Sequence, residues 1–366
     1  MLRRCTVANP GCVSSVEYCF GNATTRWGRL RHADGHPAPY RLRFVELGNE
    51  QVNGLFVSQV AAMEERAREL GVGGILSFLW PSAYFRNSSM YANASEARRA
   101  ERLGLGGRIM NDIHIVTRYS ADWQRNLLRF TSAVDVARAQ FAASPDLSFS
   151  AANLETNLFA HSMWRAVEEA EDINEFLNQH FVLPSCNRSA DARGDGGAAC
   201  APRLQIRCAS FCSGRWKGPT NATLGQDQEL VSFLPNASWM QPPGHLHAML
   251  SRSWRSRALP ISVRPAGAVP DDRRASAQLS ADGRSLRAVY VNREADEVRV
   301  RLSVTALPGG PFSRGRVTLL SADAGAENVP WQPLRVRPLN LTQAVEARGA
   351  VVRVPAVGVA VVEMYA

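Results

Sequence analysis

The chain has 366 residues and a net charge of +9, from 42 basic and 33 acidic side chains. Its length suffices for one large and one smaller domain, and an apolar content of 45% is typical of a folded globular protein. The positive charge is mostly arginine spread along the chain, whereas nucleic-acid-binding proteins concentrate it on one face or arm. No apolar run is long enough to span a bilayer. We therefore expect neither a nucleic acid nor a membrane as a partner.

Strands and helices are predicted to alternate through the first two thirds of the chain. Residues 1–39 are expected to form mostly turns. Residues 40–50 alternate apolar and polar side chains, as a strand does, and apolar side chains recur three and four positions apart over 51–70, as in a helix. Later strands are expected at 74–80, 108–115, 147–155 and 204–211, and later helices at 94–103, 120–143, 158–180 and 245–254. This alternation predicts a parallel sheet covered by helices, either a barrel or a doubly wound fold.

The apolar period changes to two near residue 259. Short strands separated by turns are expected from there on, at 286–291, 298–304, 316–320, 351–354 and 359–364. Their number and spacing predict a β-sandwich. We therefore expect an α/β barrel-type domain over residues 1–257, with a surface insertion at 183–203, followed by a β-sandwich domain over residues 258–366.

Seven cysteines and seven Asn-x-Ser/Thr sequences favour an oxidising compartment. Four of the cysteines gather in a Gly- and Ala-rich stretch without a C-x-x-C pair, so one or two disulfides are favoured over a zinc site, with free thiols as an alternative. The Asn-x-Ser/Thr sequences suit a secreted or lumenal glycoprotein, although the first residues lack the apolar core of a signal peptide. These cysteines are Cys186, Cys200, Cys208 and Cys212, and the asparagines are Asn22, Asn87, Asn93, Asn187, Asn221, Asn236 and Asn340.

An Asn-Glu pair, Asn49-Glu50, stands where the strand at 40–50 gives way to a helix. In barrel enzymes the catalytic side chains lie at this C-terminal end of the strands. By itself such a pair more often caps an ordinary helix. Its surroundings reverse that preference, because four segments occur in a specific order: Val16-Glu-Tyr-Cys-Phe-Gly21, Trp27-Gly28, Asp34-Gly-His-Pro-Ala-Pro-Tyr40 and Glu46-Leu-Gly-Asn-Glu50.

Together these segments resemble glycoside hydrolase family 51, the α-L-arabinofuranosidases. The resemblance extends over nearly the whole chain and implies a (β/α)8 TIM-type barrel followed by a jelly-roll-like β-sandwich. It makes Glu50 the general acid/base and Asn49 a contact for a sugar hydroxyl. The substrate implied is an arabinose-containing oligo- or polysaccharide, from which terminal arabinofuranosyl residues are released in L-arabinose metabolism. No metal or cofactor is implied.

A retaining glycosidase needs a second carboxylate as its nucleophile. Glu155 ends a later predicted strand, and strand ends converge on one face of a barrel. Its surroundings, Asn153-Leu-Glu-Thr-Asn157, resemble the family's seventh-strand segment, which carries the nucleophile. The alternative is a glutamate in the first turn of a helix, where the helix dipole favours negative charge.

Three further side chains are candidate sugar contacts. His114 ends the sixth strand of the family's barrel, where a histidine contacts substrate, but a buried structural histidine is nearly as well supported. Trp27 could stack on a sugar ring or pack in the core. Trp239 lies in a segment that resembles the one before the family's eighth helix.

The family's first three βα units have no counterpart in this sequence, which supplies strands four to eight and the sandwich. We therefore expect a fragment or an incomplete gene model. Its first strand would have an exposed edge, and pairing of this edge with a second copy of the chain would form a homo-oligomer. The alternative function is a truncated, non-catalytic glycosidase-like protein with weak glycan binding. An endo-acting glucanase is a third interpretation, which the run through Glu46-Leu-Gly-Asn-Glu50 disfavours.

Overall fold

The computed structural model describes residues 11–50, 54–81, 94–118, 134–137, 139, 149–182, 204–207, 213–216, 218, 229–264, 271–304, 309–343, 345–346 and 348–366. The chain divides into two compact units. The first comprises Met1–His114, Asp135–Leu154 and Asp191–Ile206, and the second comprises Ile115–Val134, Glu155–Ala190 and Arg207–Ala366. Within strands β3 and β4 the chain passes without interruption from one unit to the other.

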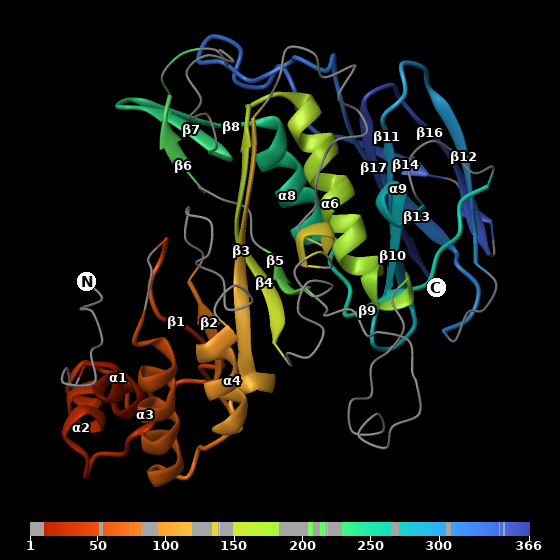
Figure 1. Ribbon diagram of the computed structural model, residues 1–366. Helices are drawn as coiled ribbons and strands as arrows, with labels where there is room; N and C mark the ends of the chain where they lie inside the picture. The colour runs from red at the N-terminus through yellow and green to blue at the C-terminus, as the bar shows by residue number, and fades with distance from the viewer. Residues whose placement is uncertain are drawn as a thin grey trace. The chain divides into compact units, whose positions relative to one another are not determined.

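A five-stranded sheet runs in the order β1-β2-β3-β4-β5, which is also the order of the strands along the chain (Figure 1). Its strands are β1 (Phe44–Glu46), β2 (Ser77–Trp80), β3 (Ile109–Arg118), β4 (Ser150–Phe159) and β5 (Leu204–Arg207). The β1–β2 and β2–β3 pairs are parallel. Neighbouring parallel strands that are consecutive in the chain require crossover connections, which are usually helices. The mixed α/β character that the sequence predicted is therefore confirmed.

Helices of the first unit pack beside this sheet. Residues of α1 (Gly11–Phe20), α3 (Phe56–Glu69) and α4 (Ala94–Arg102) share one core with its strands, and α2 (Arg26–Ala33) packs against α1. On α3 the side chains of Phe56, Val60, Met63 and Ala67 recur four, three and four positions apart, and all are buried in one core with Phe78 of β2. The predicted helix at 51–70 is therefore confirmed over the described part of its range.

The expectation of mostly turns before residue 40 was wrong for α1 and α2. In α1, Cys12, Val16 and Phe20 lie four positions apart and are buried as one stripe. The side chain of Thr25 caps α2 by accepting a hydrogen bond from the backbone N–H of Gly28. Both helices are short, so most of their stability comes from packing against the rest of the unit. Their own sequences therefore gave little indication of a helix.

The second unit contains a β-sandwich together with helices, of which the shortest described is α9 (Asp271–Arg274). A six-stranded sheet has the order β14-β13-β17-β11-β10-β9 and a three-stranded sheet has the order β12-β16-β15. One core lies between the sheets and includes Ala288 and Val352. The strands are β9 (Arg257–Leu259), β10 (Ala275–Leu279), β11 (Ser285–Asn292), β12 (Val298–Ser303), β13 (Arg314–Ser321), β14 (Leu339–Gln343), β15 (Val345–Glu346), β16 (Gly349–Val354) and β17 (Gly358–Tyr365).

The other face of the six-stranded sheet is also buried. Helices α6 (Met163–Val182) and α8 (Pro242–Arg252) form a second core with Val289 of β11 and Val361 of β17. Their chain neighbours Ala288 and Val362 belong to the core between the sheets. Because successive side chains of a strand point to opposite faces, burial on both sides explains why these strands are almost continuously apolar.

A small third sheet was not predicted. It consists of β6 (Ser213–Arg215), β7 (Val231–Leu234) and β8 (Ala237–Met240), in the order β6-β7-β8. Strands of three and four residues show too few alternations to be recognised from periodicity. The predicted helix at 120–143 and insertion at 183–203 lie largely or wholly outside the described residues.

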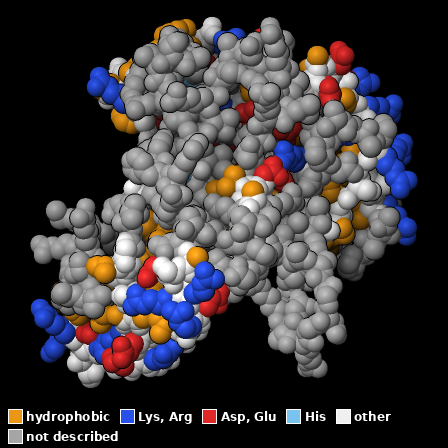
Figure 2. Space-filling view, viewed as in Figure 1, with side chains coloured by type: hydrophobic (Ala, Val, Ile, Leu, Met, Phe, Trp, Pro, Cys, Tyr) orange, Lys and Arg blue, Asp and Glu red, His pale blue; other side chains and the backbone are white. Residues whose placement is uncertain are grey.

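Two surface properties bear on the predicted partners. None of the helices described is both long enough and apolar enough to cross a bilayer. In Figure 2, Lys and Arg side chains lie in several separate places on the visible face, with acidic side chains among them.

Candidate active site

The backbone at Glu50 is unusual. Glu50 follows β1 by four residues and has a φ of +50°, a left-handed conformation, after Gly48 with a φ of 123°. For a residue with a side chain this conformation costs on the order of 1 kcal/mol, and such strain is concentrated at functional sites. The Glu50 side chain is one-third exposed (33%), so it remains open to solvent or to a ligand.

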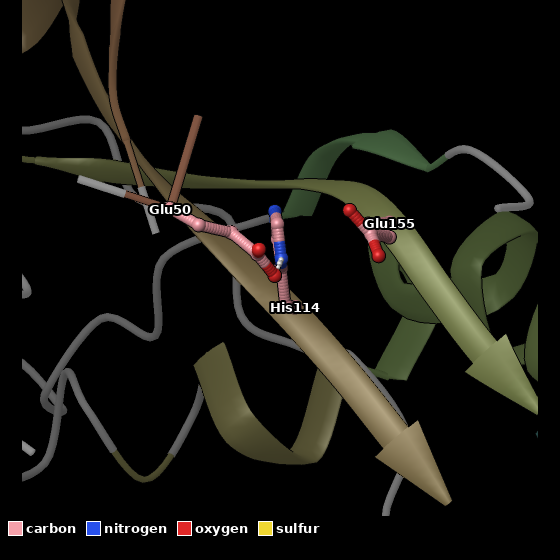
Figure 3. A group of neighbouring side chains, drawn as sticks. All are labelled: Glu50, His114 and Glu155. Carbon is pink, nitrogen blue, oxygen red and sulfur yellow. Dashed lines mark hydrogen bonds and ion pairs between the residues drawn. The ribbon is translucent and has the colours of Figure 1, made fainter. Parts of the chain in front are cut away.

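His114 lies beside Glu50. Its Nδ1 is 3.3 Å from Oε1 of Glu50, and its side chain is only 6% exposed (Figure 3). On the other side of the ring, Nε2 lies 2.8 Å from Oδ2 of Asp112, which is fully buried. Asp112 and His114 are two residues apart in β3 and therefore occupy the same face of the sheet. His114 thus stands between a buried carboxylate and a partly exposed one.

Neighbouring strand β4 fixes Asp112 in place. The backbone N–H of Leu154 donates to Oδ1 of Asp112 at 3.0 Å, and the side-chain amide of Asn153 donates to the carbonyl of Ile113 at 2.6 Å. Glu155 is the next residue of the same strand, and Figure 3 draws it with Glu50 and His114. One oxygen or nitrogen atom from each of these three side chains lies within 4.8 Å of the other two.

Two carboxylates and a histidine permit two kinds of chemistry. Such a group could bind a divalent metal ion, because each side chain offers one ligand atom. It equally suits proton transfer and nucleophilic attack at a sugar carbon, for which no metal is needed.

The remaining predicted contacts differ in their surroundings. Asn49 is exposed directly before Glu50. Trp27 on α2 is half-buried, its backbone N–H donates to Glu17 at 2.8 Å, and the Arg26 guanidinium lies 5.1 Å from its ring. Trp239 on β8 is 5% exposed, and its indole N–H donates to the carbonyl of Asn328 at 3.0 Å. Trp239 therefore has a packing role in the second unit, and its contact with a sugar stays a prediction.

Sequence reasoning missed Asp112 as a site residue. The signal was available, because a D-x-H sequence within a strand places both side chains on one face. The left-handed backbone of Glu50 left no comparable signal, since the sequence specifies a turn there but not its dihedral angles.

Comparisons with known proteins show what part of this chain, and its fold, are similar to. Residues 8–78 match the family model described as the alpha-L-arabinofuranosidase 1 domain, a segment that contains Glu50 but ends before His114 and Glu155. An extracellular exo-alpha-L-arabinofuranosidase from Streptomyces chartreusis is 47% identical over 36 residues, which are 10% of this chain and 4% of that protein. The chain thus spans only a small part of the curated relative it matches.

Two solved structures share the fold over almost the whole chain. An α-L-arabinofuranosidase from Thermotoga maritima, solved with arabinose, has a TM-score of 0.64 at 17% identity, covering 99% of this chain and 74% of that one. The family 51 α-L-arabinofuranosidase AbfB from Bifidobacterium longum has a TM-score of 0.63 at 15% identity, covering 97% and 73%. Residues 8–78 are therefore similar to an α-L-arabinofuranosidase domain, and the chain shares its fold with solved α-L-arabinofuranosidases.

Proposed function

We propose that this protein is a retaining, exo-acting α-L-arabinofuranosidase with Glu50 as general acid/base and Glu155 as nucleophile. The observation that carries the proposal is the placement of Glu50: it belongs to the matched arabinofuranosidase segment, is held by His114, and remains partly exposed. The two carboxylates of a retaining enzyme lie about 5–5.5 Å apart. The close approach of the Glu50 and Glu155 oxygens supports their use as such a pair.

Each residue has a defined step in this reaction. Glu50 protonates the oxygen of the leaving group while a Glu155 oxygen attacks the anomeric carbon, which breaks the glycosidic bond and forms an arabinosyl ester. Water then attacks the same carbon, Glu50 accepts its proton, and Glu155 is released. Two inversions give net retention. Asn49 is proposed to bind a hydroxyl beside the reacting carbon, and Trp27 to contact the sugar.

The wider architecture proposed is a partial (β/α)8 barrel over residues 1–257 and a β-sandwich over 258–366. The five strands in sequential order and the two packed sheets of the second unit support it. The substrate proposed is an arabinose-containing oligo- or polysaccharide, and the product is L-arabinose. Both related structures are of α-L-arabinofuranosidases, one of them in complex with arabinose, in agreement with that substrate.

A secreted or lumenal location is proposed for the same protein. The curated relative is extracellular. Cys12 is disulfide-bonded, and Asn22, Asn236 and Asn340 are exposed where glycans could be attached. The other four Asn-x-Ser/Thr sequences and the four clustered cysteines lie outside the described residues.

The proposal is tested by the stereochemistry and the azide response of the reaction. We expect ¹H NMR to show the α anomer of arabinose as the first product from an aryl α-L-arabinofuranoside. Glu155→Ala should abolish turnover, and azide should restore it with inversion. If azide instead rescued Glu50→Ala with inversion, the two roles would be reversed. No release of arabinose by the wild type would favour the non-catalytic alternative.

A further inference from the structure

Two tryptophans of the second unit form an exposed corner. Trp331 is 67% exposed, the largest value among the exposed large apolar side chains described. Its ring meets that of Trp216 at 80°, with 5.8 Å between the ring centres. Trp216 in turn packs edge-on against the buried Trp239 at 5.9 Å. The corner therefore rests on the core and presents an indole to the solvent.

The segment that carries Trp331 is held rigidly. Backbone N–H groups of Val329 and Gln332 each donate to the carbonyl of the other, which closes a tight turn around Trp331. Just before this turn Asn328 is fully buried, and its side chain makes three hydrogen bonds, with Met240 and twice with Val336. A side chain on a fixed turn loses little conformational entropy when a ligand stacks on it.

Hydrogen-bonded groups connect this corner to the end of strand β4. His161 lies two residues past β4, is fully buried, and contacts Glu229 at 3.1 Å. Glu229 accepts from Ser232, whose hydroxyl accepts from the amide of Gln241, and this amide also donates to the carbonyl of Asn328. Burial is the largest single influence and raises the pKa of Glu229, but the hydrogen bonds and the attraction to His161 together outweigh it and lower this pKa.

The corner is therefore fixed past the C-terminal end of the strand that carries Glu155. His161 is six residues beyond Glu155, at most about 20 Å along an extended chain. The chain that follows Glu155 therefore leads to the hydrogen-bonded residues that hold this corner, and a saccharide of several sugars is the ligand considered for both places.

Size and chemistry distinguish the possible occupants. A stable protein partner buries about 800 Å² on each side, whereas a tryptophan offers about 150–250 Å². Sugar rings have apolar C–H faces that pack on an indole while their hydroxyls stay hydrated. Exposed polar residues stand next to both rings in the chain, Arg215 before Trp216 and Gln332 after Trp331.

We propose that Trp331 and Trp216 form a stacking site for the part of a glycan that Glu50 and Glu155 do not cleave. The proposal rests on the proposed glycosidase function for the identity of the ligand class. The ligand class is a polymer or long oligosaccharide that bears arabinofuranosyl groups, which is the substrate class proposed for Glu50 and Glu155.

The test is affinity electrophoresis of the full chain in gels that contain soluble arabinoxylan or linear arabinan. We expect at least one polymer to retard the wild type, and Trp331→Ala to weaken that binding about tenfold, with Trp331→Phe recovering part of it. Trp254→Ala is the matched control, because Trp254 is 49% exposed in the same unit and packs beside Arg287 instead. Kinetically, Trp331→Ala should lower the ratio of kcat/KM on the polymer to kcat/KM on an aryl arabinofuranoside about tenfold.

Two outcomes would overturn the stacking site. One is equal retardation of the wild type and Trp331→Ala, and the other is a wild type that neither polymer retards. Binding is measured without turnover, so retardation lost in Trp331→Ala would support the site even if the protein released no arabinose. If Trp331→Ala released arabinose with the same preference for the polymer as the wild type, the glycosidase function would be supported and the stacking site would be wrong.

Discussion

His114 joins Glu50 to Asp112: its two ring nitrogens lie 3.3 Å and 2.8 Å from one oxygen of each carboxylate. Since the backbone of Leu154 holds Asp112, the orientation of the imidazole is set by a buried group. Loss of that group should let the imidazole turn and release Glu50 from its position.

We therefore expect Asp112→Asn to lower kcat by about tenfold or more, with a smaller change in KM, because the variant keeps the size of the side chain and removes its charge. The pH–rate profile should shift as well, because the substitution removes a buried charge 2.8 Å from the imidazole beside Glu50. Asp296→Asn, at an exposed aspartate, is the control. An Asp112→Asn enzyme with the wild-type profile would show that Asp112 only fills space.

The role of Glu50 predicts a dependence on the leaving group. Glu50→Ala should slow the release of arabinose from a natural glycan by about 100-fold or more, because its alkoxide leaving group requires a proton. A nitrophenyl arabinofuranoside, whose leaving group is stable as an anion, should be affected far less in its first step. Steady-state and burst kinetics on both substrates measure the difference. Equal losses on the two substrates would contradict proton donation by Glu50.

A pH dependence of stability is predicted from two glutamates of α6. Burial raises the pKa of Glu168 and of Glu171 to about 7 in each case, although Arg293 lies 3.8 Å and 3.0 Å from their carboxylates and opposes the shift. In the unfolded chain both groups titrate near the ordinary value of about 4.3. Between these values the folded state binds more protons, so its stability falls as pH rises.

The contribution of these groups is fully present below about pH 4.3 and is lost as pH rises through 7, on the order of 3 kcal/mol for each group. Urea unfolding at pH 5.5 and pH 8 should show the loss as a lower free energy of unfolding at pH 8. Glu171→Gln should flatten the dependence, and Glu294→Gln, at an exposed glutamate, should leave it as in the wild type. An equal slope in Glu171→Gln and the wild type would assign the pH dependence to other groups.

The buried Arg31 predicts a stability effect in the first unit. Its guanidinium is fully buried and donates to the carbonyls of Tyr18, His36 and Pro37, which fixes the segment that leads to β1. The single ammonium group of lysine cannot donate to three carbonyls in this planar arrangement. Arg31→Lys should therefore lower the free energy of unfolding by about 2–3 kcal/mol. Chemical denaturation followed by circular dichroism measures it, with the exposed Arg29→Lys as control. A change in the free energy of unfolding below about 0.5 kcal/mol would contradict this role of Arg31, since surface substitutions have effects of that size.

An exposed strand edge predicts self-association. β1 is the terminal strand of the five-stranded order, and Phe44 is 45% exposed beside Leu42 at 36%. Unprotected apolar edges pair with other chains. Phe44→Lys should therefore shift the protein toward the monomer in sedimentation velocity, whereas Leu103→Lys, at another exposed apolar residue, should not. Identical distributions for the two variants would rule out association through β1.

Periodicity and motif order predicted much of this fold. The apolar stripe of α3 marks its buried face directly, because that face follows from 3.6 residues per turn, and the nearly continuous apolar runs of β11 and β17 indicate burial on both faces. The order of motifs around Glu50 singled it out as a site residue, and its role stays a prediction. Helices α1 and α2 and the β6–β8 sheet escaped prediction because they are short and depend on tertiary packing. The backbone contacts that hold Asp112 and Ile113 escaped because hydrogen bonds between β3 and β4 join residues about forty positions apart.

The double burial of the six-stranded sheet limits how this protein could be divided or recombined. Helices α6 and α8 belong to the first predicted domain in sequence, yet they share one core with Val289, Val291, Val359 and Val361 of the sandwich. A gene cut after residue 257 would expose that core on both products. The sandwich is therefore inherited together with the helix that follows Glu155, and an exchange of modules between relatives should be tolerated only where it moves α6, α8 and the sandwich as one block.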